Sequence, residues 1–246
     1  MQCRDIGCSI TQMKDLIHQI LWTSGARGVV VGISGGIDSA VAAVVAAKAL
    51  GPERVLGVSM PVSTNSPLDH AGAKELCDKF GIELITVPLD SVVAAAFADP
   101  SLTDTPVLRG NYTARLRMAT LYNIAASRDA LVCGTSNKTE YMIGYSTKWG
   151  DSAADIQPLL HLWKKDVAAI AEELGIPRSI VDKMPSAGFW EGQSDEGELG
   201  ITYPELDAAL IRLEEHEFVP ENPLEEQVLA FINKSSHKRL QAVSLL

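Results

Sequence analysis

Short apolar runs alternate along the chain with longer segments in which apolar positions recur at a helical period. The apolar runs predict strands that are buried on both faces, at Gly28–Ile33, Val55–Met60, Glu83–Val87 and Ala130–Cys133. The amphipathic segments predict helices at Gln12–Thr23, Asp38–Leu50, Asp69–Phe80, Tyr112–Ser127, Lys164–Leu174, Tyr203–Glu215 and Pro223–Lys234. This alternation predicts an α/β fold with a doubly wound, mostly parallel sheet and helices on both of its faces.

Glycine residues mark the ends of several predicted helices. Gly51 follows the second helix, Gly81 follows the third, and Gly175 follows the fifth. The segment Ser186–Gly200 is different, because it is rich in glycine and acidic residues and has almost no periodicity. We expect a long loop there, and long loops within compact domains are often functional.

The size and composition indicate a compact protein. A chain of 246 residues lies within the range of roughly 200–250 residues that single α/β domains reach, so we expect one domain over residues 1–246. No apolar run approaches the roughly 20 residues of a membrane span, and the first residues lack the pattern of a secretory signal. These features favour a cytoplasmic protein with no membrane partner.

The net charge and the cysteines exclude several classes of function. The formal net charge of −10 disfavours a general nucleic-acid binder, so any anionic ligand needs a local cluster of donors. The cysteines form no C-x-x-C pair and have no neighbouring histidine ligands, which indicates neither zinc nor a disulfide framework. Reduced thiols are expected at Cys3, Cys8, Cys77 and Cys133.

The clearest chemical motif is the run SGGIDSA, which leads from the first predicted strand directly into a helix. Glycines in such a turn expose backbone N–H groups at the positive end of the helix, and Ser34 and Ser39 add hydroxyl groups. Neither a Walker motif nor a G-x-G-x-x-G fingerprint is present. Asp38 would repel a pyrophosphate unless a divalent cation lay between them, so we infer Mg²⁺. In the alternative interpretation, Asp38 and Ser39 only cap the helix.

The string S-G-G-x-D-S after a strand resembles the pyrophosphate loop of the ATP pyrophosphatases, which cleave ATP to AMP and pyrophosphate. The resemblance implies an adenine-nucleotide alpha-hydrolase-like, Rossmann-like fold. It also implies that ATP contacts Gly32, Ile33, Ser34, Gly35, Gly36, Ile37, Asp38 and Ser39. Because enzymes with different acceptors share this loop, the loop by itself does not indicate the substrate.

Further segments resemble the NAD synthetases, a family within this group. They include Asn111–Met118, which is similar to N-x-x-A-R-x-R-M, and Gly144–Asp151, which is similar to G-Y-x-T-K-x-G-D. Gly134–Glu140 and the segment from Pro185 to Ile201 are also similar, with Phe189 and Ser194 as mild departures. Arg115 and Arg117 point in different directions on a helix, so we expect only one of them to face the site.

The resemblance implies roles for individual residues. Asp38 and Glu140 would bind Mg²⁺, and Lys164 would complete the catalytic set with them. Besides the loop, the expected ATP contacts are Thr135, Lys164 and Ser186. The expected contacts to nicotinate adenine dinucleotide (deamido-NAD) are Arg115, Lys148, Asp155, His237 and Lys238.

The implied reaction is the ATP-dependent amidation of deamido-NAD to NAD. The nicotinate carboxylate would attack the α-phosphate of ATP, and ammonia would then expel AMP, so no protein nucleophile is needed. We expect no glutaminase domain in this chain, although a separate glutaminase subunit could deliver the ammonia. The resemblance also implies a homodimer. Two alternatives are a tRNA-thiolating ATP pyrophosphatase, which the net charge disfavours, and a nucleotide-binding regulatory module without turnover.

Overall fold

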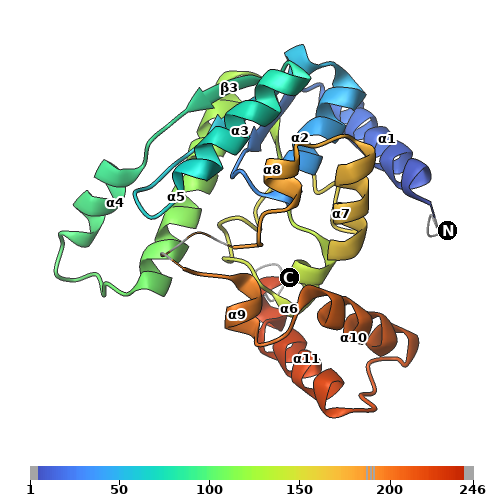
Figure 1. The fold of residues 1–246 in the computed structure, drawn as a ribbon. Coiled ribbons are helices and arrows are strands. Elements are labelled where there is room, and N and C mark those ends of the chain that lie inside the picture. The colour runs from blue at the N-terminus through green and yellow to red at the C-terminus, as the bar shows by residue number, and fades with distance from the viewer. Residues whose placement is uncertain (1–4, 187, 189, 191, 241–246) are drawn as a thin grey trace, which may run out of the picture.

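A parallel sheet of four strands forms the centre of the computed structural model, which describes residues 5–186, 188, 190 and 192–240 (Figure 1). The strands are β1 (Gly28–Gly32), β2 (Val55–Ser59), β3 (Glu83–Thr86) and β4 (Ala130–Cys133). They pair in parallel in the order β3-β2-β1-β4. The predicted doubly wound, parallel sheet is therefore confirmed.

The strands differ in burial. Every residue of β2 is buried, and β1 is buried except at its last residue. In β3, by contrast, Glu83 and Thr86 are exposed, so the prediction that all strands are buried on both faces is wrong for this one. The reason is its place in the sheet, because β3 lies at the edge and has a neighbouring strand on one side only.

The predicted helices are all present, most of them with shifted ends. They are α1 (Ile6–Ser24), α2 (Ile37–Leu50), α3 (Pro67–Phe80), α5 (Pro106–Ser127), α7 (Lys164–Glu173), α10 (Tyr203–Glu215) and α11 (Pro223–Lys234). Short elements that the periodicity did not predict are η1 (Pro52–Arg54), α4 (Asp90–Phe97), α6 (Lys138–Ile143), α8 (Arg178–Val181), α9 (Asp195–Leu199) and η2 (Ser236–Lys238). Such short segments contain too few turns to show a helical period.

Helix α9 corrects the expected loop at Ser186–Gly200. The side chain of Ser194 accepts a hydrogen bond from the amide of Gly197 and so caps the start of this helix. Gly200 ends the helix in a left-handed conformation, with φ of +67°. Residues 187, 189 and 191 of the expected loop lie outside the described residues.

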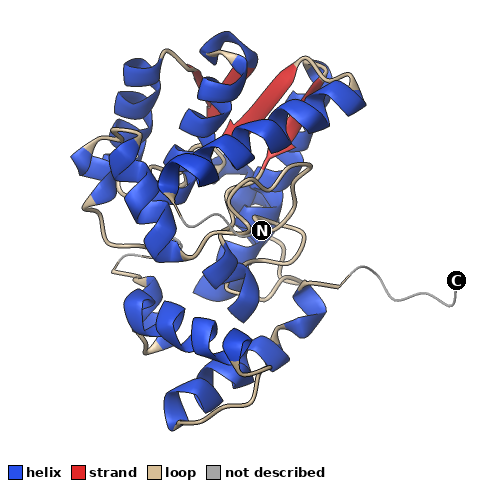
Figure 2. Cartoon of the chain, turned by 90° about the vertical axis from the view of Figure 1, so that its right-hand side faces the viewer, coloured by secondary structure: helices blue, strands red, loops and turns tan. Residues whose placement is uncertain are grey.

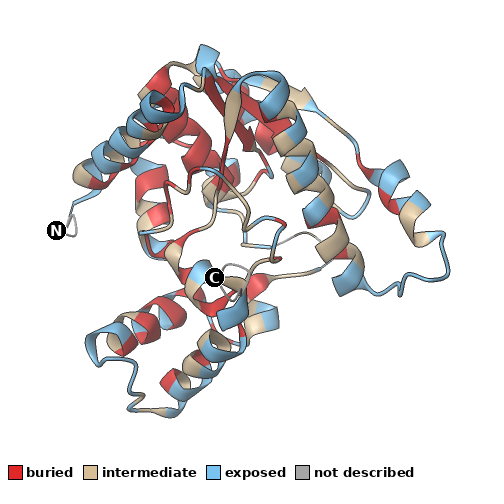
Figure 3. Cartoon of the chain, turned by 180° about the vertical axis from the view of Figure 1, so that it is seen from behind, coloured by how far each residue is buried: buried red, intermediate tan, exposed pale blue. Residues whose placement is uncertain are grey.

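Helices cover both faces of the sheet (Figure 3). On one face, α1, α2, α3 and α7 pack around an apolar core that includes Ile17, Val41, Leu76 and Ile170. On the other face, α4 and α5 cover Val30 and Val58 with residues such as Val93 and Ala125. Helix α2, rich in alanine and valine, is buried along most of its length, so the phosphate loop that precedes it rests on a fixed base.

A third apolar cluster joins α6, α10 and α11 into a helical lobe. This lobe lies below the sheet in Figures 1 and 2. Its buried residues include Ile143, Leu206, Leu210 and Val228. We call this part of the chain the C-terminal lobe. The sequence predicted α10 and α11 as helices but not where they pack.

The cysteines follow the sequence expectation only in part. Cys77 and Cys133 are buried free thiols, and burial raises their pKa values to about 11 and about 12. Cys8 is disulfide-bonded, so the expected reduced thiol is wrong there, because pairing depends on proximity in space and not on a C-x-x-C spacing. Cys3 lies outside the described residues. No helix among the described residues is long and apolar enough to cross a membrane.

Candidate active site

A cavity lies where the strand order of the sheet reverses. Strands β1, β2 and β3 extend the sheet to one side, whereas β4 adds to β1 on the other side. Loops that follow β1 and β4 therefore diverge, and ligands of open parallel sheets bind in the crevice between them. A cavity of about 580 Å³ lies at this edge and is lined by the ends of β1, β2 and β4, among them Ser34, Ser59 and Thr135.

The phosphate loop closes on itself through its two serines. The Ser39 hydroxyl accepts from the Ser34 amide at 3.2 Å, donates to the Gly36 carbonyl at 2.9 Å and lies 3.1 Å from the Ser34 hydroxyl. Gly35 has a φ of +78°, and a Cβ there would lie 2.4 Å from the carbonyl oxygen of Asp69. Ser34 and Gly36 line the cavity, whereas Ser39 is buried and holds the loop in shape.

Asp38 does not cap helix α2. The cap residue is Gly36, and it makes no side-chain cap hydrogen bond. One carboxylate oxygen of Asp38 instead accepts from the Asn137 amide nitrogen at 2.8 Å, and the other lies 2.6 Å from the ammonium of Lys164. The interpretation of Asp38 as a simple helix cap is therefore wrong.

The structure brings Asp38, Glu140 and Lys164 together from α2, α6 and α7. The Lys164 ammonium lies between the two carboxylates, 2.6 Å from Asp38 Oδ2 and 3.0 Å from Glu140 Oε1. Burial raises the pKa of Glu140 to about 7, with a further contribution from the charge of Asp38. Burial opposes the charged form of Lys164, but the two carboxylates outweigh this effect and raise its pKa. The carboxylate pair of Asp38 and Glu140 thus favours a cation between its two members.

The donor set of this pair fits Mg²⁺. Carboxylate oxygens are the hard ligands that Mg²⁺ prefers, and it commonly uses one or two of them together with water and substrate phosphates. Asp38 and Glu140 are available for this, and they already share one cationic partner. Within the part of the chain that the structure describes, no group of three or more His, Cys, Asp or Glu residues could form a complete protein cage. A site that shares Mg²⁺ with a phosphate substrate is therefore the arrangement that fits.

Aromatic side chains that sequence reasoning did not single out complete the surroundings of Lys164. Its ammonium lies 4.9 Å from the ring centroid of Tyr203, within cation–π range. The Tyr203 hydroxyl donates to Asp195 Oδ2 at 3.0 Å, and the Tyr145 hydroxyl donates to Asp195 Oδ1 at 3.1 Å. No sequence signal pointed to Tyr203, because it lies just beyond the similar segment that ends at Ile201 and begins a predicted helix.

Four of the residues expected to contact a dinucleotide also lie together. We call Arg115, Lys148, His237 and Lys238 the basic cluster. Arg115 donates to the Lys148 carbonyl at 3.3 Å, and Lys148 Nζ donates to the His237 carbonyl at 2.5 Å. Lys238 Nζ donates to the carbonyls of Gly144 and Ser146, at 2.8 and 2.6 Å. Of the four, Lys238 lines the cavity.

Asp155 lies elsewhere. Its carboxylate accepts from the Val132 amide at 2.8 Å, and its own amide donates to the Val132 carbonyl at 2.9 Å. Strand β4 is at the edge of the sheet, so its outer backbone groups need such partners. Asp155 is not among the residues that line the cavity. Its expected contact with the dinucleotide stays a prediction.

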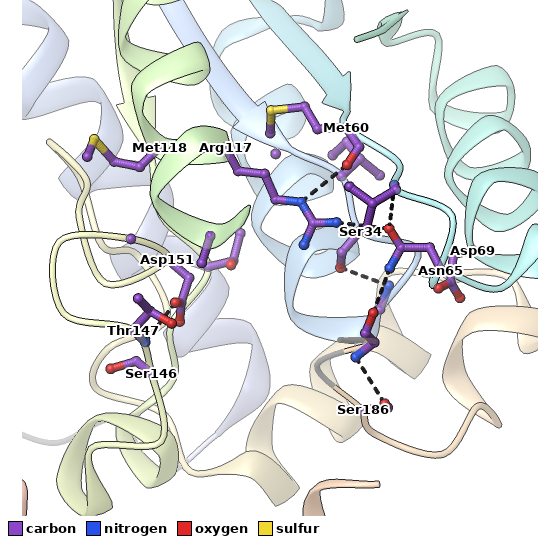
Figure 4. A pocket seen from close by; sticks show the side chains of 18 of the residues that line it. Ser34, Met60, Asn65, Asp69, Arg117, Met118, Ser146, Thr147, Asp151 and Ser186 are labelled. Carbon is purple, nitrogen blue, oxygen red and sulfur yellow. Dashed lines mark hydrogen bonds between the residues drawn. The ribbon is translucent and has the colours of Figure 1, made fainter. Parts of the chain in front are cut away.

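Arg117 lines the cavity wall, whereas Arg115 does not, and the expected contact of Arg115 with the dinucleotide stays a prediction (Figure 4). Its guanidinium donates to Asn65 Oδ1 at 2.9 Å and to the Met60 carbonyl at 3.2 Å. One arginine of the pair therefore faces the cavity while the other joins the basic cluster. Helical geometry predicts that the two diverge, but it does not say which of them faces inward.

Ser186 lies at the rim of the cavity, where the segment after α8 approaches the loop after β2 (Figure 4). Its hydroxyl accepts from the Gly188 amide at 3.1 Å, and the Gly188 carbonyl accepts from Asn65 Nδ2, also at 3.1 Å. Trp190 and Gln193 also line the cavity. The two segments therefore cover the cavity from one side.

A glycine-rich turn that leads into a helix, beside the point where the strand order of a parallel sheet reverses, is typical of a nucleotide-binding α/β protein. The chain belongs to the NAD synthase family, because the model of that family matches residues 9–242. The predicted membership and fold class are thereby confirmed.

Individual relatives cover nearly the whole chain. An NH(3)-dependent NAD(+) synthetase of Methanoregula boonei is 48% identical over 243 residues, which is 99% of this chain and 98% of the relative. Among solved structures, an NMN synthetase from Francisella tularensis has a TM-score of 0.90 and 36% identity, covering 98% of this chain and 99% of the other. An NH3-dependent NAD synthetase from Campylobacter jejuni, in complex with the nitrate ion, has a TM-score of 0.85 and 28% identity, covering 98% and 100%.

Proposed function

We propose that the chain is a ligase that amidates deamido-NAD to NAD, using ATP and ammonia and releasing AMP and pyrophosphate. The observation that carries the proposal is one cavity with the phosphate loop on its wall and Lys238 of the basic cluster also lining it. Curated relatives such as the NH(3)-dependent NAD(+) synthetase of Methanoregula boonei support the same reaction.

In this proposal the ATP phosphates bind at the N-terminus of α2. Ser34 and Gly36 face the cavity there, and Thr135 and Ser186 line it as further ATP contacts. Asp38 and Glu140 would hold Mg²⁺, which when bound would supply positive charge for the departing pyrophosphate. Lys164 lies against both carboxylates and would add a second positive charge to the same site.

The basic cluster is proposed to hold the dinucleotide through the negative charges of its phosphates. A nicotinate carboxylate resists attack by ammonia, because it is an anion and has no good leaving group. Transfer of AMP to the carboxylate removes the negative charge and provides the leaving group, after which ammonia displaces AMP. Such catalysis depends on positioning, which can lower a barrier by on the order of 7–11 kcal/mol in the best cases, and on electrostatics, which can lower it by several kcal/mol more.

A turnover assay tests the proposal. Incubation of the protein with ATP, Mg²⁺, ammonium and deamido-NAD is expected to release NAD and AMP in equal amounts. ADP as the product would contradict the chemistry. The absence of NAD while ATP is bound would favour the regulatory module considered above.

A second acceptor has specific support. The NMN synthetase from Francisella tularensis has the higher TM-score and identity of the two solved structures described above, which suggests a mononucleotide acid as an alternative acceptor. The two candidates differ in the adenylate half of the acceptor. Comparing kcat/KM for deamido-NAD and for nicotinate mononucleotide decides between them, and we expect the dinucleotide to be preferred.

The remaining expectations belong to the same proposal. They are a single domain over residues 1–246 and a homodimer in the cytoplasm. Gel filtration with light scattering tests the dimer, and cell fractionation tests the location. Assaying ammonium against glutamine as nitrogen donor, with and without cell extract, tests whether a separate glutaminase is involved.

A further inference from the structure

Helix α10 of the C-terminal lobe reaches the candidate active site through a buried carboxylate, Asp207. Only 1% of this residue is exposed. One carboxylate oxygen accepts from the Thr139 hydroxyl at 2.5 Å, and the other accepts from the Lys165 amide at 2.9 Å. Burial raises the pKa of Asp207, so the protein places an ionisable group where its charge is costly.

The partners of Asp207 adjoin two residues of the carboxylate site. The Thr139 hydroxyl also accepts from the backbone amide of Lys164, at 3.0 Å. The first amides of a helix have no partner within the helix, and here side chains of α6 and α10 bond two amides of the first turn of α7. Thr139 directly precedes Glu140 in the chain. One hydrogen-bonded pair thus ties the start of α7, with Lys164, to the residue beside Glu140.

The short length of α6 makes this tie important. Helix α6 has 6 residues, and a helix of this length is not stable without tertiary contacts. Thr139 is fully buried in the contact with α10, so the position of Glu140 depends on that contact.

Helix α10 also contacts the other end of Lys164. Tyr203 lies one turn before Asp207, and residues four apart share one face of a helix. Its ring lies 4.9 Å from the Lys164 ammonium, and the residue is 6% exposed. The same face of α10 therefore contacts the charged group of Lys164 directly and supports its backbone through Thr139 and the Lys165 amide.

We propose that Asp207 is a positioning residue for the reaction, which sets the placement of Glu140 and Lys164 relative to each other. The C-terminal lobe is then part of the active site's framework. This inference rests on the proposed function for its activity readout, but its binding readout requires only that the protein binds Mg·ATP.

Glu225 provides a matched control in the same lobe. It is a carboxylate in the first turn of α11 and is 1% exposed, like Asp207. It accepts from the Glu221 amide at 2.8 Å, from Asn222 Nδ2 at 2.7 Å and from Arg212 Nε at 2.6 Å. None of these partners is a candidate site residue, so loss of this carboxylate changes the lobe without changing the tie to Lys164.

The test compares Asp207→Asn with Glu225→Gln. Each variant keeps the shape of the side chain but turns one acceptor oxygen into a donor group. Mg·ATP affinity by titration calorimetry, kcat, KM and the unfolding midpoint are measured for both. We expect Asp207→Asn to weaken Mg·ATP binding or lower kcat by about 10- to 100-fold, as loss of supporting contacts around a metal site does. Glu225→Gln is expected to lower the unfolding midpoint but to leave Mg·ATP affinity and KM at the wild-type values.

A second pair of variants covers the case in which Asp207→Asn does not fold. Thr139→Val removes the hydroxyl at nearly constant shape, whereas Thr139→Ser keeps it. Thr139→Val should show the loss expected for Asp207→Asn, and Thr139→Ser should restore Mg·ATP affinity.

The proposal would be overturned if Asp207→Asn and Thr139→Val keep the wild-type Mg·ATP affinity and kcat while their unfolding midpoints fall. That result would show that the contact is only structural. If the wild-type protein binds Mg·ATP but forms no amide product, the proposed function fails while the affinities still decide the role of Asp207. A wild-type protein that does not bind Mg·ATP would overturn both.

Discussion

The phosphate loop and the basic cluster, the two proposed anion sites, are built in different ways. The phosphate loop is one continuous segment between β1 and α2, and it places backbone amides and serine hydroxyls at a helix N-terminus. The basic cluster takes its side chains from α5, from the segment after α6 and from η2. An anion site made of backbone depends on local conformation, whereas one made of side chains depends on how distant segments pack.

The difference is also visible in what holds each region in place. The serines of the loop make hydrogen bonds to residues at most five positions away, whereas the Asp38 side chain bonds Asn137 and Lys164, 99 and 126 positions away. Lys148 and Lys238 instead donate to carbonyls 89 to 94 positions away. Changes in the loop should therefore affect ATP and its cleavage, and changes in the cluster should affect the dinucleotide.

The largest expected effect is that of Asp38→Asn. Removing one carboxylate of the cation-binding pair should lower kcat by about 10²- to 10³-fold or more, because charge on the departing pyrophosphate is no longer neutralised. The fold should stay intact, since Asn keeps the shape of Asp38, and circular dichroism checks this. The exposed Asp78→Asn serves as the control with unchanged kcat. Near-normal rates for Asp38→Asn would show that the metal assignment is wrong.

Lys238→Met should show that the two regions bind different substrates. Loss of a charged donor at the cavity wall is expected to raise KM for deamido-NAD by about 10- to 100-fold and to change KM for ATP little. Initial rates with each substrate varied in turn measure this. The exposed Lys234→Met, on α11, is the matched control. Equal increases in both KM values would break the proposed division between the regions.

Gly35→Ala changes the phosphate loop and leaves the basic cluster as it is. A side chain at a φ of +78°, with Cβ only 2.4 Å from the Asp69 carbonyl, forces the backbone to shift. We expect a loss of stability of about 1–3 kcal/mol, read from the unfolding midpoint in a thermal melt. ATP affinity should fall with it. Weaker binding of deamido-NAD but not of ATP would contradict the comparison.

The smallest expected effect is a dependence on alkaline pH. Burial lowers the pKa of Lys238 from 10.5, so its charge is lost at a lower pH than that of an ordinary lysine. KM for deamido-NAD should therefore rise as the pH approaches 10.5 from below, a few-fold at most, whereas Lys164 has a raised pKa and stays charged there. Lys238→Arg should flatten this rise, because arginine keeps its charge to about pH 12 or higher. A rise that persists unchanged in Lys238→Arg would show that another group is responsible.

Sequence reasoning succeeded where the signal was local. The turn from β1 into α2 combines a buried apolar run, two glycines and a helix start, and each of these is encoded within a few residues. The strands and the longer helices were predictable for the same reason. Short helices such as α6 and α9 were not, because tertiary contacts stabilise them more than their own sequence does.

The candidate site also has one part that local sequence determines and another that depends on tertiary packing. By itself the sequence determined the turn of the phosphate loop, since the hydrogen bonds of its two serines lie within Ser34–Ser39. Tertiary structure alone placed Lys164 against Asp38, 126 positions away, turned Arg117 toward the cavity, and linked Asp207 to Thr139 across 68 positions. The physical reason is that a short segment can specify its own backbone conformation, whereas the surroundings of a side chain depend on the packing of the whole chain.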